Sequence, residues 1–81
     1  MGHTGVVEIE ISEGSIRLGQ LLKFANVVMD GGEAKALIAA GDVTVDGERE
    51  TRRGRQVSVG SVVQVRLPRG RQTLRLVAPR D

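Results

Sequence analysis

Hydrophobic and polar residues alternate near the start of the chain. Val7, Ile9 and Ile11 share one side of this alternation, and Glu8 and Glu10 lie on the other. A period of two residues is typical of a strand with one buried face. The pattern therefore predicts an N-terminal strand whose outer face is acidic.

The next apolar pattern has the period of a helix. The apolar positions follow the spacing i, i+3, i+4 and i+7, and they are Leu18, Leu21, Leu22 and Ala25. We expect Ser15 to be the N-cap, because its hydroxyl can accept a hydrogen bond from the first turn. Asn26 is expected to end the helix. Phe24 lies beside the apolar stripe, and we expect it to pack in the core.

A second short helix is predicted after a connection through residues 27–32. Asp30 and Glu33 have the spacing of a capping box. The inward stripe consists of Ala34, Leu37 and Ile38. Gly41 is expected to end the helix in the left-handed conformation, because glycine has no Cβ to be strained there.

Short strands account for the rest of the chain. Val43 and Val45 alternate with polar residues, and Asp46-Gly47 is a strong signal for a two-residue hairpin turn into residues 48–51. Further strands are predicted at 56–58, 62–67 and 72–79, with the last of them closing a C-terminal hairpin. The order of elements is therefore a strand, two helices and then several strands.

Composition limits the kind of protein this can be. The chain has 81 residues, 40% of them hydrophobic and 27% charged, which predicts a single domain over residues 1–81 with a modest core. It has no cysteine, which excludes disulfides and thiolate zinc sites, and its one histidine, His3, lies in a polar N-terminal stretch to which we assign no role. No apolar run reaches the ~18 to 20 residues of a membrane-spanning helix. We expect a soluble, cytoplasmic protein without membrane contact.

Charge is distributed unevenly along the chain. Residues 1–50 carry four basic and nine acidic side chains, whereas residues 51–81 carry eight arginines and one aspartate. The net charges of the two parts are thus −5 and +7, and such asymmetry is typical of a surface that binds a polyanion. The string Arg-Gly-Arg-Gln occurs at 53–56 and again at 69–72. The first copy follows Arg52 and is the stronger candidate; the role of the second stays open.

Catalysis has little support in the sequence. Without cysteine, tyrosine or a well-placed histidine, a nucleophile would have to be Ser, Thr or Lys with a carboxylate base, and no spacing indicates such a pair. Glu48 and Glu50 lie two residues apart in a predicted strand, where a solvated edge explains them. We therefore expect no enzyme, no cofactor and no metal site.

Binding of structured RNA fits the side chains better. Arginine outnumbers lysine ten to two, and guanidinium groups can contact phosphates in a bidentate manner and stack on bases. Phe24 is the only aromatic residue, so the aromatic surfaces of an RRM or an OB-fold are not expected. The second helix offers one basic residue, Lys35, and no Arg, Asn or Gln, which argues against a helix-turn-helix that reads DNA.

Five segments between residues 16 and 65 form a recognisable combination. They are RLGQLLK at 17–23, GGEAK at 31–35 followed by Leu37-Ile38, VTVDG at 43–47, TRRGR at 51–55, and Val59-Gly60. Any one of these strings is common, but together they are fairly specific. The combination resembles the S4 RNA-binding domain family, and within it the small stand-alone bacterial S4-like proteins.

The resemblance implies an α+β fold with an αL motif. In this fold two short helices pack on a small, mostly antiparallel sheet, here with an N-terminal strand and a C-terminal hairpin. The resemblance also implies that structured RNA, either rRNA or tRNA, lies along the helix pair and the loop that follows. The matching basic residues are Arg17, Lys23, Lys35, Arg52, Arg53 and Arg55.

The sequence thus favours a non-catalytic module that binds structured RNA. The alternative is a protein-interaction adaptor, in which the acidic first strand and the arginine-rich strands bind protein partners and RNA contact is incidental. The choice of RNA, an association with the ribosome and the oligomeric state are left open by the sequence.

Overall fold

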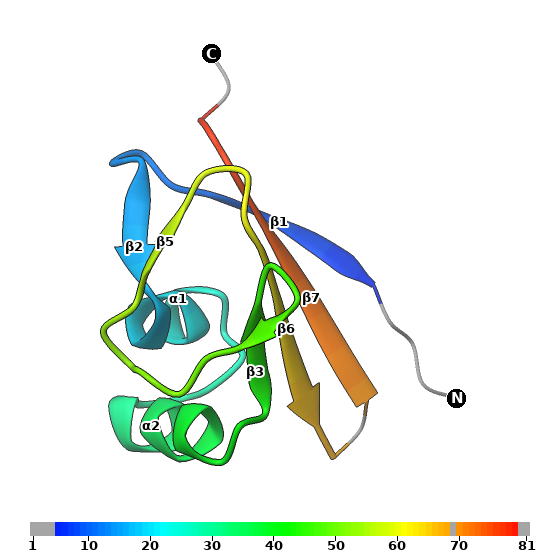
Figure 1. The fold of residues 1–81 in the computed structure, drawn as a ribbon. Coiled ribbons are helices and arrows are strands. Elements are labelled where there is room, and N and C mark those ends of the chain that lie inside the picture. Colours follow the sequence, from blue (N-terminus) through cyan, green and yellow to red (C-terminus); the bar gives the residue numbers. More distant parts are fainter. Residues whose placement is uncertain (1–4, 69, 80–81) are drawn as a thin grey trace.

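The computed structural model describes residues 5–68 and 70–79 (Figure 1). His3 and Arg69, which the sequence singled out, lie outside the described residues. In chain order the elements are β1 (Val6–Glu10), β2 (Ser15–Arg17), α1 (Leu18–Phe24), α2 (Gly31–Ala39), β3 (Val43–Val45), β4 (Glu48–Arg49), β5 (Gln56–Ser58), β6 (Val62–Leu67) and β7 (Gly70–Val77).

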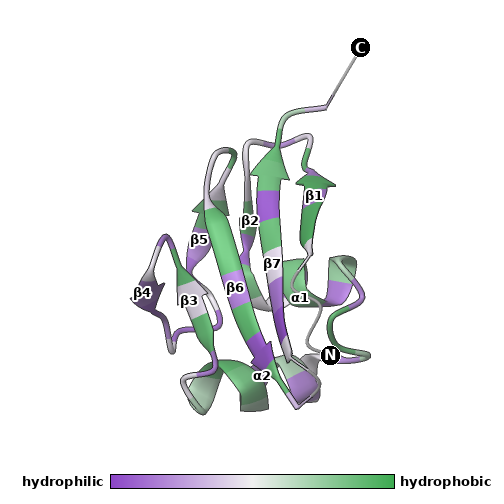
Figure 2. Cartoon of the chain, turned by 90° about the vertical axis from the view of Figure 1, so that its right-hand side faces the viewer, coloured by the Kyte–Doolittle hydropathy of each residue, from purple (hydrophilic) through white to green (hydrophobic). Residues whose placement is uncertain are grey.

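Most of the strands belong to one sheet. Its order is β1-β7-β6-β3-β4, and β2 pairs with β5 in a separate two-stranded sheet. Strand pairing is antiparallel except between β1 and β7, which are parallel with Val6 opposite Thr73. The helices lie on one side of the large sheet (Figure 1), and Figure 2 looks onto its other side with the helices behind it. The expected α+β fold with a mostly antiparallel sheet is confirmed.

The core lies between the helices and the covered face of the sheet. Strands β6 and β7 alternate between hydrophobic and hydrophilic bands along their length (Figure 2), and their buried positions face the helices. The largest fully buried side chains are Leu18, Leu21, Leu22, Ile38, Val43, Val45, Val57, Val63, Val65, Leu74 and Leu76. Burying one such side chain stabilises the fold by roughly 1.5 to 3 kcal/mol. The fully buried side chains therefore come from the predicted apolar stripes of the helices and from the alternating apolar positions of the strands.

The start of the first helix differs from the prediction. Ser15 is not an N-cap, because residues 15–17 form β2 and pair with β5, and the Ser15 hydroxyl donates to Gln56 Oε1 at 3.0 Å. The helix begins at Leu18, with Arg17 in an extended conformation before it. The sequence did not reveal this strand, because its pairing partner lies about forty residues further along the chain.

The second helix and the turn after β3 follow the prediction closely. Asp30 accepts a hydrogen bond from the Glu33 N–H at 2.9 Å, as in a capping box. Gly41 follows the helix with φ of +81°, the left-handed conformation expected for it. Asp46 and Gly47 have φ of +52° and +87°, which is the signature of a type I′ hairpin turn.

Phe24 is not in the core, contrary to the prediction. Its side chain is 61% exposed at the C-terminal end of α1. At about 100° per residue, Phe24 is rotated about 240° from Leu18 and lies beyond the edge of the buried stripe. Val7 is also exposed, at the start of the edge strand β1, whereas Ile9 and Ile11 are buried as expected. The fold therefore displays one aromatic ring on its surface.

The spacing of Glu48 and Glu50 predicted that both lie on a solvated edge. This prediction is wrong for Glu50, which is buried. Only 6% of Glu50 is exposed. Its carboxylate accepts hydrogen bonds from the Arg52 N–H at 2.9 Å, from Arg52 Nε at 3.1 Å and from Arg55 Nη1 at 2.7 Å. The Arg52 side chain, the Arg52 backbone N–H and the Arg55 side chain together lower the Glu50 pKa from 4.5 to about 2. The carboxylate thus holds the chain between β4 and β5 in one conformation.

The left-handed turn at Gly41 gives a first prediction for stability. We expect Gly41→Ala to lower the free energy of unfolding by about 1 to 2 kcal/mol, because an L-residue is strained at this φ. A Cβ at Gly41 would also lie 3.0 Å from Arg49 Cδ. Gly31→Ala is the control, since a Cβ there meets nothing within 4 Å. Thermal unfolding of both variants checks this, and equal midpoints would contradict it.

The lowered Glu50 pKa predicts how stability depends on pH. A carboxylate whose pKa is lower in the folded state stabilises the fold above its ordinary pKa, and this stabilisation is lost as the pH falls through the folded value. The protein should therefore lose stability between pH 4.5 and about 2. Glu50→Gln should be less stable at neutral pH and show a flatter profile in this window, whereas Glu48→Gln should keep the wild-type slope. Urea titrations at several pH values measure this, and parallel profiles for the wild type and Glu50→Gln would refute it.

Candidate nucleic-acid interface

The first turn of α1 is capped by the backbone of the loop at residues 51–55. The first N–H groups of a helix have no partner within the helix, and the Arg17 side chain supplies none. Instead, the Leu18 N–H donates to the Arg55 carbonyl at 2.8 Å and the Gly19 N–H donates to the Arg53 carbonyl at 3.0 Å. The loop is therefore fixed to the beginning of the helix.

The side chain of Arg53 lies against α1 at Gly19. A Cβ at Gly19 would be 2.6 Å from Arg53 Cγ and 3.2 Å from Arg53 Cδ. Only glycine, which has no side chain, leaves room for the aliphatic part of Arg53 so close to the helix backbone. Gly19 therefore contributes to the position of Arg53.

Three of the six predicted residues border one hollow. The hollow has a volume of about 330 Å³ and lies between α1, the beginning of α2 and the loop at 51–55. Arg17, Lys23 and Arg53 supply its positive charges, and the remaining wall consists of Gly19, Gln20, Gly31, Ala34 and Gly54. No acidic side chain lines it among the described residues. A phosphate in this hollow would therefore meet only positive and neutral groups.

Arg52 and Arg55 occupy a different environment. Both are paired with Glu50, at 3.1 Å and 2.7 Å, so part of their charge is already compensated. The hydrogen bond to Glu50 and its charge also raise the pKa of Arg52. The Arg52 side chain is nevertheless 75% exposed, so its outer edge is open to a ligand. These two arginines fix the loop that carries Arg53.

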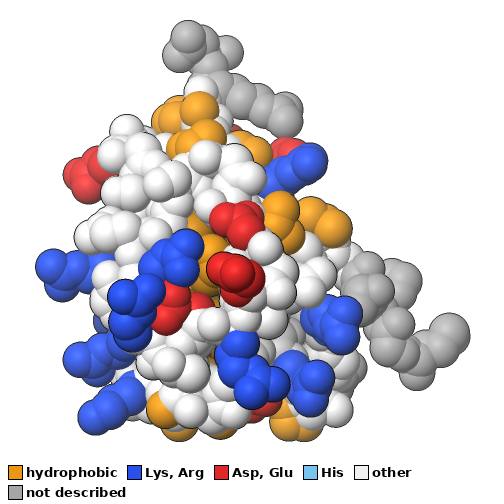
Figure 3. All heavy atoms as spheres, viewed as in Figure 1, with side chains coloured by type: hydrophobic (Ala, Val, Ile, Leu, Met, Phe, Trp, Pro, Cys, Tyr) orange, Lys and Arg blue, Asp and Glu red, His pale blue; other side chains and the backbone are white. Residues whose placement is uncertain are grey.

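Lys35 is exposed on α2 but does not line the hollow. Figure 3 shows that basic side chains gather mostly in the lower half of the molecule, along its left edge and across its front.

A second group of arginines lies on the open face of the large sheet and was not among the predicted site residues: Arg49, Arg66 and Arg71. The sequence contained two signals for this group: the alternation of arginine with buried residues in β6 and β7, and the second Arg-Gly-Arg-Gln string, which contains Arg71 and whose role was left open.

Neither a cluster of metal ligands nor a membrane-spanning helix is found in the described part of the chain. Residues 5–68 and 70–79 contain no group of three or more His, Cys, Asp or Glu side chains that could hold a metal ion. Within the same ranges no helix is long and apolar enough to cross a membrane.

Comparison with known proteins shows the family of this chain. The S4 domain family matches residues 9–73, which includes both helices and the loop at 51–55. A similar relative is the probable ribosome maturation protein RlbA of Bacillus subtilis (strain 168), which is 44% identical over 57 residues, covering 70% of this chain and 80% of the relative. The chain therefore belongs to the S4 RNA-binding domain family.

Proposed function

We propose that this protein binds structured RNA without catalysing a reaction, and that the hollow between α1, α2 and the loop at 51–55 is the contact surface. The observation that carries the proposal is the convergence of Arg17, Lys23 and Arg53 on one hollow lined by no acidic side chain. Phosphate groups supply most of the affinity in such complexes, and arginine contacts them well. Gly31 and Gly54 in the wall, where a Cβ would meet nothing within 4 Å, let an RNA backbone approach closely.

The six predicted residues take different roles in this proposal. Arg17, Lys23 and Arg53 contact phosphates in the hollow, and Lys35 extends the positive surface along α2. Arg52 and Arg55 chiefly hold the loop through Glu50, with the exposed edge of Arg52 as an additional contact. The whole chain, residues 1–81, acts as one domain in the cytoplasm.

Ribosomal RNA is the favoured target. The similar protein of Bacillus subtilis is named as a probable ribosome maturation protein, and an RNA contact made by shape and phosphates suits a folded rRNA segment. Crosslinking in cells followed by sequencing of the bound RNA would distinguish rRNA from tRNA. Recovery of tRNA alone would refute the assignment to rRNA.

The first functional prediction concerns Arg53. If four to six phosphates are neutralised, the logarithm of the affinity should fall with the logarithm of salt concentration with a slope of about −3 to −5. Arg53→Glu should reduce the affinity for an RNA hairpin at least tenfold and make this slope less steep by about one to two. Its thermal midpoint should stay close to that of the wild type, because Arg53 forms no ion pair among the described residues.

Arg75→Glu is the control for Arg53→Glu, because Arg75 is exposed on β7 and carries the same charge. Fluorescence anisotropy with a labelled hairpin measures both variants. Equal losses would show that net charge governs binding and that the hollow has no special role. A slope near zero for the wild type would favour the protein-interaction adaptor.

The second functional prediction concerns the form of the RNA. An RNA hairpin should compete better than an unstructured pyrimidine strand of equal length, because proteins that bind splayed single strands generally use several aromatic side chains. Phe24 is the only aromatic residue in the chain. Competition titrations at constant salt measure the difference. If the single strand bound equally well, stacking on Phe24 would have to be tested in place of recognition by shape.

A further inference from the structure

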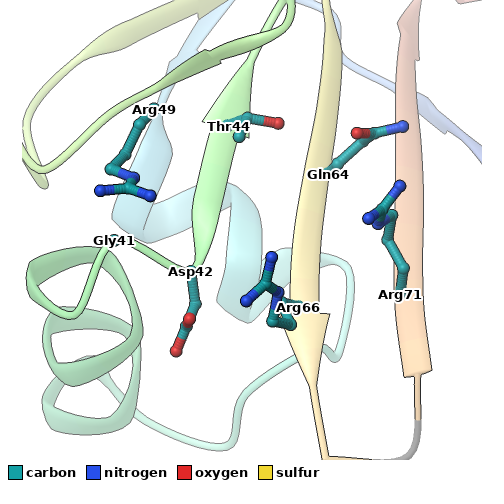
Figure 4. A pocket seen from close by; sticks show the side chains of 7 residues that line it. All are labelled: Gly41, Asp42, Thr44, Arg49, Gln64, Arg66 and Arg71. Atoms are coloured by element: carbon teal, nitrogen blue, oxygen red, sulfur yellow. The ribbon is translucent and has the colours of Figure 1, made fainter.

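The open face of the large sheet carries a second positively charged hollow. It has a volume of about 130 Å³ and is bordered by Arg49, Arg66 and Arg71. Thr44 and Gln64 lie between these arginines, and Gly41 and Asp42 complete the rim (Figure 4). This face is turned away from the helices, because Val43, Val45, Val63 and Val65, which alternate with these residues, are buried beneath it.

Strand register brings the five polar side chains together. Thr44 on β3 lies opposite Arg49 on one side and opposite Gln64 on the other. Arg66 on β6 lies opposite Arg71 on β7. The side chains of directly opposed residues project from the same face of the sheet. The hollow is thus built from neighbouring positions on four strands, a rigid support for a site.

The three arginines of this hollow have no charge partner in the part of the chain that the structure describes. Among the described residues, none of the three forms a salt bridge, although Arg66 and Arg71 are like charges directly opposite each other. Such an arrangement is unfavourable in the absence of an anion. Asp42 is the one carboxylate of the rim, and in Figure 4 its side chain points away from Thr44 and Gln64. The hollow therefore retains a strong positive charge.

Two neutral groups complement this charge. The Thr44 hydroxyl oxygen is buried and has no hydrogen-bond partner among the described residues. A hydroxyl and the amide of Gln64 can both donate to an oxyanion, as guanidinium groups do.

The Arg49 stem lies against the turn at Gly41, where a Cβ would be 3.0 Å from Arg49 Cδ. The turn thus limits where the Arg49 side chain can lie.

We propose that this hollow is a second phosphate-binding site, occupied by a phosphate of the RNA backbone. Its volume lies below the roughly 300 to 1,000 Å³ of pockets that enclose whole ligands, so it suits one phosphate group better than a nucleotide. The face is open, so a polymer can pass across it. The proposal rests on the proposed function, and it makes the protein a two-sided RNA binder that contacts one RNA segment beside the helices and another on the sheet.

The test uses a matched pair of variants of the full chain. Arg71 and Arg75 both lie on β7, are exposed and point from the same face, but only Arg71 borders the hollow. Arg71→Gln should weaken binding of an RNA hairpin with a long stem by three- to tenfold and reduce the steepness of the salt slope by about one. Arg75→Gln should change the affinity less than twofold. Arg66→Gln should behave like Arg71→Gln.

Backbone amide shifts in NMR spectra locate the contact independently of affinity. Titration with the hairpin should shift the Thr44 and Gln64 amides, and Arg71→Gln should abolish these shifts while the shifts at Gly19 and Gly54 persist. Inorganic phosphate is the second probe. Shifts at Thr44 and Gln64 with phosphate but not with RNA would overturn the assignment to an RNA phosphate.

The results separate this inference from the proposed function. If Arg53→Glu abolishes binding while Arg71→Gln and Arg75→Gln are alike, the sheet site is refuted and the helix-side contact stands. If Arg71→Gln abolishes binding and Arg53→Glu does not, RNA contacts the sheet alone and the two-sided arrangement is wrong. If the wild type binds no structured RNA at all, the proposed function and this inference both fail.

Discussion

The arrangement of the helix side depends on two backbone hydrogen bonds at the start of α1. A helix leaves its first N–H groups unpaired, and burying them without partners is costly. Here the carbonyls of Arg53 and Arg55 are the partners, from a loop about thirty-five residues further along the chain. One requirement of helix formation therefore determines where the loop lies. The arginines of that loop are presented beside α1 as a consequence.

Glu50 holds the loop at 51–55 in one conformation, and this requires burying its negative charge. Removing a carboxylate from water is unfavourable unless hydrogen bonds and opposite charge compensate it, and Arg52 and Arg55 provide both. The resemblance to the S4 family had implied that the same two arginines contact RNA. Neighbouring arginines thus differ in their contacts: Arg52 and Arg55 pair with an internal carboxylate, and Arg53, between them, forms no ion pair among the described residues.

Local patterns predicted most of the elements, and long-range pairing accounts for what they missed. The capping box at Asp30 and Glu33, the left-handed Gly41 and the Asp46-Gly47 turn are determined by residues a few positions apart, so the sequence is sufficient for them. Strand β2 exists because it pairs with β5, and the cap of α1 comes from residues 53 and 55, which no local pattern indicates. The resemblance brought Arg17, Lys23 and Arg53 into one list, but the hollow that unites them depends on tertiary contact.

Two arginines on opposite sides of the fold are positioned in the same way. Arg53 lies against Gly19 and Arg49 lies against Gly41, and in both places a Cβ would come within about 3 Å of the arginine stem. Ordering an arginine side chain normally costs up to about 2 kcal/mol of conformational entropy when a ligand binds. A stem that already lies against a glycine has lost part of that freedom on folding, so less remains to be lost on binding. The net charge of +2 therefore does not describe the surface well, because positive charge is concentrated locally and the stems of these two arginines are already partly ordered by folding.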